Sequence, residues 1–267
     1  MTWVVELAEG SILLFGCALF VALICVHGVG LALGRRDQMR NRHSDSVGII
    51  VGGMLGLLAF VLALTLSFAN SRFTDHQSSS LAEANAIGTA WLRAKAIGTP
   101  HGEAIASLLE TYTRVRTDFV RAGRDPATIG AINDRTSALQ SEIWGHLAVL
   151  VRARPDPVTS SLMAALNDTF DASTKERFAY HLTLPPQLFW LLIGMTLVSI
   201  GSLGYQFGLK KNPSLILAIL LTLMWTWVIL EILDLASGRL GYIRTGTAVY
   251  EWTLQGFQGG LPLPPSD

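Results

Sequence analysis

Four long apolar runs constrain this chain more than any other feature of its sequence. They cover residues 11–34, 47–69, about 184–208 and about 213–235. A helix of about 20 residues crosses the ~30 Å hydrocarbon core of a bilayer, and each run is long enough to do so. A core helix of a soluble protein can be equally apolar, but four such runs that end at charged residues or proline are typical of membrane helices. The sequence therefore predicts an all-α, polytopic membrane protein with four transmembrane helices.

The polar residues are concentrated between the second and third apolar runs. The whole chain is 50% hydrophobic and only 15% charged, whereas a soluble domain carries about 25% charged residues. This deficit lies in the four runs, so the intervening segment resembles an ordinary soluble protein. Helical spacing of its apolar residues, such as Leu81, Ala84, Ile87 and Trp91, predicts helices throughout.

The predicted organisation therefore has four parts. They are residues 1–69 with the first two transmembrane helices and a basic loop, 70–183 with a polar helical bundle, 184–235 with the other two transmembrane helices, and 236–267 as a C-terminal tail. The second membrane helix has no breaker at its end and is expected to continue to Ile97. Three shorter helices, at about 102–121, from about 127 to 154 and at 158–182, complete the bundle.

The short loops predict the orientation. They contain Arg35, Arg36, Arg40 and Arg42 after the first run, and Lys210 and Lys211 after the third. Basic residues in short loops favour the cytoplasmic side, so we expect both loops inside the cell. The two termini and the polar bundle are then expected outside it.

Composition and motifs argue against several functions. The chain has 20 basic and 20 acidic residues, so no basic surplus indicates a nucleic-acid partner. Gly28, Gly30 and Gly34 resemble a dinucleotide-binding loop only superficially, because they lie within an apolar helix with no preceding strand. No nucleophile elbow, P-loop or zinc-protease motif occurs. We therefore expect no enzymatic activity, no catalytic residue, no cofactor and no metal site.

Small side chains form a stripe along the second apolar run. Its members recur at intervals of four or three residues and are Gly48, Gly52, Gly56, Ala59, Ala63, Ser67 and Asn70. Small residues allow membrane helices to approach closely. The stripe therefore predicts packing against another helix of the same chain, symmetric packing between copies, or a pore wall. Leu55, Leu58, Leu62 and Leu66, on other faces, are candidates for a hydrophobic constriction.

A second set of candidates consists of polar residues expected near the outer membrane surface. They are Glu83, Asn85, Arg93, Asp171, Arg177, Glu231, Asp234 and Arg239. Acidic residues within a membrane helix are costly, so Glu231 and Asp234 indicate either a structural partner, such as Arg239 or Arg244, or a site for permeating cations. Solvated acids on helix faces are the alternative for the bundle residues.

One segment of eleven residues closely resembles the signature of the bacterial bestrophin-like membrane family, a domain of unknown function. It reads Glu83-Ala84-Asn85-Ala86-Ile87-Gly88-Thr89-Ala90-Trp91-Leu92-Arg93. The supporting pieces are Ser67-Phe68, Ser71-Arg72-Phe73, Leu166-Asn167-Asp168 with Asp171 and Arg177, Gly204-Tyr205 with Gly208-Leu209, and Ile232-Leu233-Asp234-Leu235. The resemblance covers about residues 45–250. The family usually continues with Asp-Arg-Pro and Gly, whereas this chain has an altered segment at 235–241.

The resemblance implies a function, because bestrophins are pentameric anion channels. We therefore expect an oligomeric ion channel of the bacterial cytoplasmic membrane whose partners are the lipid bilayer, further copies of the chain and inorganic ions. A pentamer is one assembly that the resemblance allows. Acids at the outer mouth would favour cations, whereas the likeness to bestrophins favours anions. The alternative is a membrane-anchored sensor or interaction scaffold whose bundle binds a partner.

Overall fold

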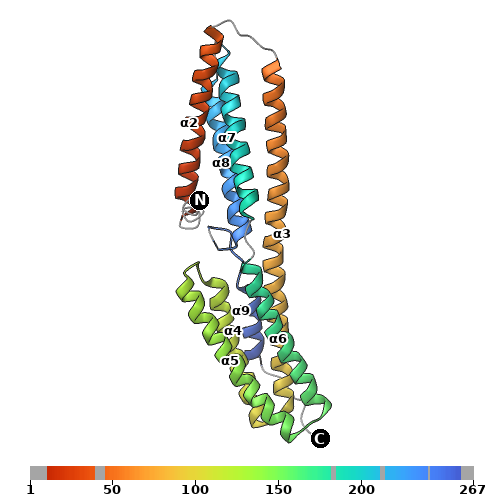
Figure 1. Cartoon of the computed structure of the whole chain (residues 1–267). Coiled ribbons are helices and arrows are strands. Elements are labelled where there is room, and N and C mark those ends of the chain that lie inside the picture. Colours follow the sequence, from red (N-terminus) through yellow and green to blue (C-terminus); the bar gives the residue numbers. More distant parts are fainter. Residues whose placement is uncertain (1–10, 40–45, 182–184, 211–213, 240, 260–267) are drawn as a thin grey trace. The chain divides into compact units, whose positions relative to one another are not determined.

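The computed structural model describes residues 11–39, 46–181, 185–210, 214–239 and 241–259, and every regular element within these ranges is an α-helix (Figure 1). The helices are α2 (Ile12–Met39), α3 (Ser46–Ile97), α4 (Pro100–Arg121), α5 (Pro126–Ala153), α6 (Pro157–His181), α7 (Pro186–Gly208), α8 (Leu215–Ser237) and α9 (Ala248–Gln258). The predicted all-α fold is confirmed for these residues. Arg40, Arg42 and Lys211, on which the predicted orientation partly depends, lie outside the described ranges, as do the first ten and last eight residues.

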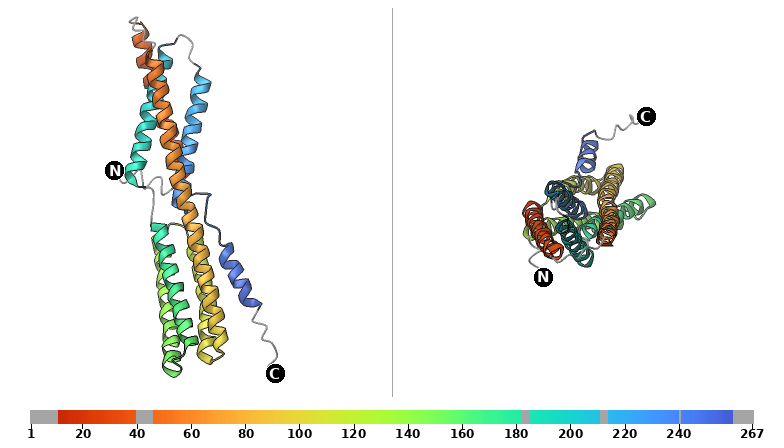
Figure 2. Two further views of the ribbon diagram at one scale, coloured as in Figure 1. Left: turned by 90° about the vertical axis from the view of Figure 1, so that its right-hand side faces the viewer. Right: turned by 90° about the horizontal axis from the view of Figure 1, so that it is seen from above.

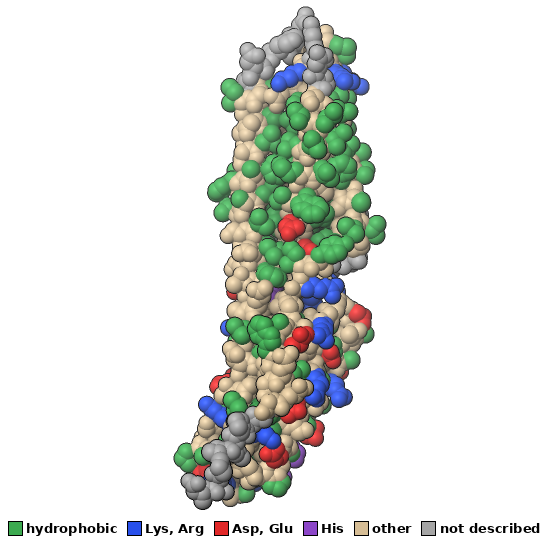
Figure 3. Space-filling model, turned by 180° about the vertical axis from the view of Figure 1, so that it is seen from behind, with side chains coloured by type: hydrophobic (Ala, Val, Ile, Leu, Met, Phe, Trp, Pro, Cys, Tyr) green, Lys and Arg blue, Asp and Glu red, His purple; other side chains and the backbone are tan. Residues whose placement is uncertain are grey.

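Four of these helices are long and apolar enough to cross a membrane. They are α2, α3, α7 and α8, as the apolar runs predict. Their exposed surfaces carry large apolar side chains, including Leu57, Phe60, Leu220 and Trp227, each more than half exposed. Figure 3 shows such side chains gathered over this part of the molecule. A soluble protein rarely exposes so much contiguous apolar surface, so these faces are suited to lipid.

The chain divides into two compact units. One comprises residues 1–72 and 183–243, and the other comprises residues 73–182 and 244–267. We call the described residues of the first the membrane unit and those of the second the bundle unit. Helix α3 contributes its first part to the membrane unit and its second part to the bundle unit, and it is continuous from Ser46 to Ile97 (Figure 2).

Helices α2 and α7 pack backbone against backbone in the membrane unit. A Cβ atom added to Gly34 would lie 2.1 Å from the carbonyl oxygen of Tyr205, and one added to Gly204 would lie 2.2 Å from that of His27. Only glycine permits such an approach, which is typical of small-residue packing between membrane helices. Phe15, Leu23, Leu58, Ile200 and Ile229 are part of the buried core around this contact.

Local sequence signals mark where helices of the bundle unit end and begin. Gly98 adopts a left-handed conformation with φ of 65° after α3, and Thr99 caps α4 by accepting a hydrogen bond from the backbone N–H of Gly102. Asp125 caps α5 in the same way through Thr128. Both caps precede a proline at the first helical turn, where its missing N–H costs nothing. The amphipathic helices α4, α5 and α6 then bury their apolar faces together with α3.

Helix α9 was not predicted from the sequence. Residues 236–267 were expected as a tail, whereas α9 belongs to the bundle unit and packs against α4. Its buried residues are Tyr250 and Phe257, and the ring of Phe257 stacks on Trp91 with 4.8 Å between centroids. The bundle unit therefore includes a C-terminal helix.

Candidate functional site

The stripe of small residues on α3 is uncovered in the membrane unit. A Cβ atom added to Gly52 or Gly56 would meet nothing within 4 Å, and Ala59, Ala63 and Ser67 are exposed. Gly48, at the start of the stripe, lies near the side chain of Gln206 of α7. Within the described part of the chain, no helix covers the stripe from Gly52 onward. Packing inside one chain therefore does not account for it.

The opposite face of α3 packs within the chain. Val51, Leu58 and Leu62 are at most 3% exposed, and Leu58 and Leu62 belong to the core of the membrane unit. The hypothesis that these two leucines form a constriction does not fit the structure, because their side chains are buried against the chain's own helices. The exposed face of α3 instead consists of small residues.

The exposed face of α3 repeats every eleven residues. Successive residues of the stripe are four, four and three positions apart, and this set of steps then repeats. Ala59 and Asn70 therefore follow Gly48 at intervals of eleven residues, and Ala63 follows Gly52. In the bundle unit, exposed residues of α3 keep the same steps. They are Thr74, Ser78, Leu81, Asn85, Thr89, Leu92 and Ala96. A repeat of eleven residues in three turns is typical of helices that wind around each other with a right-handed twist.

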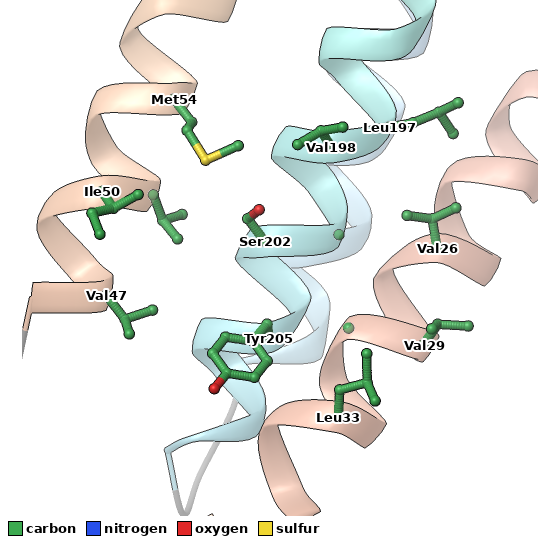
Figure 4. A pocket seen from close by; sticks show the side chains of 13 residues that line it. Val26, Val29, Leu33, Val47, Ile50, Met54, Leu197, Val198, Ser202 and Tyr205 are labelled. Carbon is green, nitrogen blue, oxygen red and sulfur yellow. The ribbon is translucent and has the colours of Figure 1, made fainter. Parts of the chain in front are cut away.

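An open apolar groove of about 580 Å³ lies between α2, α3 and α7 in the membrane unit (Figure 4). Val47 and Met54 of α3 point toward α7, where Val198 and Tyr205 lie, and Ile50 of α3 also lines the groove. A second groove of about 450 Å³ between α3 and α7 shares Met54 and Val198 with it. Both grooves are lined almost entirely by apolar side chains, so they suit acyl chains or another helix and not a polar substrate.

Asp234, near the C-terminal end of α8, is tied to the backbone that follows. Its carboxylate accepts hydrogen bonds from the backbone N–H groups of Gly241, Tyr242 and Ile243 at 2.9, 2.9 and 3.2 Å. Asp234 is buried, and these contacts tie residues 241–243 to the end of α8, which the left-handed residue Gly238 caps. The geometry therefore supports a structural role for Asp234. Glu231 is half-buried on the same helix.

Glu83, the first residue of the family signature, is fully buried in the bundle unit beside Arg116 and Glu176. The guanidinium of Arg116 lies 2.6 Å from Glu83 Oε1 and 2.6 Å from Glu176 Oε2. The hydroxyl of Tyr250 lies 2.7 Å from Glu83 Oε2 and 2.9 Å from Glu176 Oε1. Ser80 also donates to Glu176 Oε1. We call these five residues the buried ion cluster.

Four members of the buried ion cluster were not predicted from the sequence. Arg116 carried a usable signal, because it lies within the apolar stripe of α4 between Tyr112 and Phe119, where a charge is expected to be buried. Such a charge requires partners of opposite sign. Glu176 and Tyr250 carried no comparable signal, since each comes from a different, distant segment of the chain.

The other bundle residues of the predicted polar set do not join the cluster. Arg93 donates to the carbonyl oxygen of Ser161 at 2.6 Å, while Asn85, Asp171 and Arg177 are exposed. Arg239 is buried in the membrane unit. The eight predicted residues therefore fall into at least two separate environments. Among the described residues, no group of three His, Cys, Asp or Glu side chains could hold a metal ion.

Burial dominates the electrostatics of the cluster. It raises the pKa of Glu83 to about 8, against the lowering effect of Arg116. The pKa of Glu176 is lowered although burial opposes this, because neighbouring Glu83 and Arg116, together with hydrogen bonds from Ser80 and Tyr250, favour its ionised form. The pKa of Tyr250 is raised by burial and by the two carboxyl groups. Of the two carboxyl groups in this cluster, Glu83 is therefore the one that is protonated near neutral pH.

A family model described as the Bestrophin-like domain matches residues 16–238 of the chain. The matched range includes α3 to α8, most of α2 and four of the five residues of the buried ion cluster, and it ends before α9, which carries Tyr250. Comparison with curated proteins gives no match, and neither does comparison with solved structures.

Proposed function

Because the chain belongs to the Bestrophin-like family, we propose that it assembles into an oligomeric ion channel in a membrane. The observation that carries this proposal is the uncovered stripe on α3, from Gly52 to Ser67. Lipid gives no hydrophobic drive for helices to associate, so close packing of small residues is a main source of affinity between them. An uncovered stripe of this kind is suited to face further copies of α3 around a shared axis.

The eleven-residue spacing supports an arrangement around an axis. Helices whose contact face repeats every eleven residues wind around each other with a right-handed twist. This twist keeps the same face of each helix toward the shared axis over many turns. The exposed positions of α3 keep this spacing in the membrane unit and again in the bundle unit. We infer that several α3 helices line the path along both segments.

The chemistry of the stripe suits permeation better than tight binding. It contains glycine, alanine and, toward the bundle, Ser67 and Asn70, and it carries no charged side chain. Small side chains leave space at the axis, and hydroxyl and amide groups can replace water around an ion. The likeness to bestrophins favours anions as the conducted species.

The bundle unit is proposed to lie outside the membrane, on the side opposite to the loops after α2 and α7. Arg35 and Arg36 in α2 and Lys210 after α7 support cytoplasmic loops by the positive-inside rule. In this arrangement the bundle helices of the several copies surround the outer entrance to the channel.

The proposal is tested with the purified full-length chain in two measurements. Its mass in lipid nanodiscs gives the number of copies, and liposomes loaded with chloride or potassium reporters give flux for each ion. A multimer that conducts is the expected result. A multimer without flux of either ion would favour the membrane-anchored scaffold, and a monomer would exclude the proposed channel.

A further inference from the structure

The buried ion cluster joins four helices of the bundle unit. Glu83 and Ser80 come from α3, Arg116 from α4, Glu176 from α6 and Tyr250 from α9. All five side chains are at most 1% exposed. Two carboxyl groups facing one guanidinium in such a site would carry a net negative charge if both were ionised. Burying an unbalanced charge is costly, so the number of protons in the cluster matters.

The hydroxyl of Tyr250 shows where a proton is needed. It lies within hydrogen-bond distance of Glu83 Oε2 and of Glu176 Oε1 at once, at 2.7 and 2.9 Å. A phenol has one hydrogen and can donate to only one of these oxygens. The other contact is a hydrogen bond only if the carboxyl oxygen carries a proton and donates it to Tyr250.

The remaining contacts assign this proton to Glu83. Both oxygens of Glu176 accept other hydrogen bonds, from Ser80 and from Arg116 Nη2, as expected of an ionised carboxylate. Arg116 approaches Glu83 Oε1 to 2.6 Å but stays 3.2 Å from Oε2, the oxygen beside Tyr250. A proton on Oε2 accounts for this asymmetry, because a protonated oxygen is a weaker acceptor.

We propose that the buried ion cluster is a proton-binding site, with one exchangeable proton on Glu83, and that loss of this proton releases α9 from the bundle unit. With the proton present, Glu83 donates to Tyr250, Tyr250 donates to Glu176, and Glu176 balances the charge of Arg116. Without it, Tyr250 faces two ionised carboxylates with one hydrogen, and the cluster carries one uncompensated negative charge. The inference concerns the bundle unit alone and does not depend on ion conduction.

Helix α9 is the helix that we expect to dissociate from the bundle unit. It has 11 residues, and only Tyr250 and Phe257 are buried, whereas α3, α4 and α6 are long helices of the bundle. Val249 and Leu254 pack against the bundle core as partly buried residues. The ion pair between Glu251 and Arg121, in which both side chains are about half exposed, contributes little. Releasing α9 would let water reach the cluster and would uncover fewer buried side chains than releasing α4.

Two other titratable side chains lie near the cluster on its own helices, and each contacts a different partner. Tyr112 of α4 is buried, its pKa is raised by burial, and its hydroxyl contacts Gln140 of α5. On α3, His76 lies two turns before Glu83 and packs on Tyr180 of α6. In the described part of α9, Tyr250 is the titratable residue in the cluster. The pKa of Glu83, raised by burial to about 8, agrees with proton release just above neutral pH.

The test follows the mobility of α9 with a nitroxide label. Gln255 is exposed on α9, so Gln255→Cys is labelled in a full-length chain whose native cysteines carry Cys17→Ala and Cys25→Ala. Electron paramagnetic resonance in nanodiscs is recorded between about pH 6 and pH 9.5. We expect the mobile fraction to rise severalfold with a midpoint at about pH 8. A mobile fraction that stays constant over this range would overturn the proposal.

Two variants distinguish the effect of the proton on Glu83 from a general weakening of the contacts that hold α9. Glu83→Gln keeps a neutral group that can donate to Tyr250, so its α9 should stay immobile up to the highest pH. Phe257→Ala removes the stacking on Trp91 and should raise mobility at every pH while mobility still increases with pH, because Glu83 is intact. An unchanged pH response in Glu83→Gln would refute the assignment of the proton to this residue.

A further measurement does not require any variant to fold. Infrared difference spectroscopy of the wild-type chain should show the C=O band of a protonated carboxylic acid that disappears with the same midpoint as the mobility change. If no such band is lost over the pH range, the cluster does not hold the proposed proton.

Discussion

Gly30 of α2 and Gly201 of α7 bring two helix backbones into direct contact, since a Cβ atom on Gly30 would lie 2.1 Å from the carbonyl oxygen of Gly201. Backbone atoms cannot move aside as the end of a flexible side chain can. Any side chain at position 30 must therefore push the two helices apart along their whole contact.

We predict that Gly30→Ala destabilises the membrane unit by about 3 kcal/mol or more, at the upper end of the usual cost of overpacking. The measurement is the temperature at which the purified protein in detergent loses its monodisperse peak in size-exclusion chromatography. Gly28→Ala is the matched control, because a Cβ atom at Gly28 meets nothing within 4 Å. Equal melting of the two variants would show that the contact is not close in the folded protein.

The stripe on α3 predicts a change of assembly or of flux when bulk is added. Gly56→Leu should either lower the oligomeric mass in nanodiscs or, if the mass is kept, reduce ion flux at least tenfold by filling the axis. Gly28→Leu adds the same bulk to an exposed glycine of α2 and should change neither. Normal mass together with normal flux in Gly56→Leu would remove the stripe from the functional residues.

The orientation of the helices can be checked with single cysteines in the Cys17→Ala, Cys25→Ala background. Met39 ends α2 and Ala138 lies on α5, and both are exposed. A membrane-impermeant thiol reagent added to intact cells should label Ala138→Cys and leave Met39→Cys unlabelled until the cells are opened. Labelling of both from the same side contradicts the proposed topology.

Asp234→Asn should lower the yield of folded protein while leaving flux per channel unchanged. An asparagine side chain would turn an N–H group toward backbone N–H groups that now donate to the carboxylate, and each donor left unsatisfied costs about 1–3 kcal/mol. Folded yield and liposome flux are measured side by side, with Glu231→Gln as a control in the same helix. Normal yield with an altered ratio of chloride to potassium flux would instead make Asp234 a selectivity residue.

The bundle unit should lose stability as pH rises from about 4.5 to about 8, the ordinary and the raised pKa of Glu83. In this interval the folded state holds a proton on Glu83 that the unfolded chain has released, so unfolding becomes easier with increasing pH. Glu176, whose pKa is lowered, acts in the opposite sense and only at more acidic pH. Chemical denaturation followed by circular dichroism near pH 6 and pH 8.5 measures the difference, which Glu83→Gln should abolish. Equal stability of the wild type at both pH values would contradict the raised pKa.

The helices were largely predictable because their signals are local. Apolar length marked the four membrane helices, and Gly98-Thr99-Pro100 and the proline at 126 marked helix boundaries that the structure places within a few residues. The resemblance to the bestrophin-like family, read from the signature that begins at Glu83, is confirmed. Each of these signals is contained in a short stretch of sequence.

The contacts between helices were not predictable, because their signals are split between distant segments. Gly30 and Gly201 each look like ordinary glycines of a membrane helix, and only their pairing brings the backbones together. Tyr250 lies in a region with no long apolar pattern, and its partners are more than 70 positions away. Whether the stripe on α3 conducts ions remains a prediction, since it depends on copies of the chain that meet outside one protomer.

The pairing of α2 with α7 also has a consequence for how the protein is made. The glycine surface of α2 cannot be covered until the ribosome has synthesised α3 to α6 and then α7, which at ~5–20 residues per second takes on the order of ten seconds. During this interval α2 is in the bilayer with a groove that suits any small-residue helix. Membrane insertases or chaperones that shield newly made helices should therefore be needed more for this chain than for one whose first two helices pair with each other.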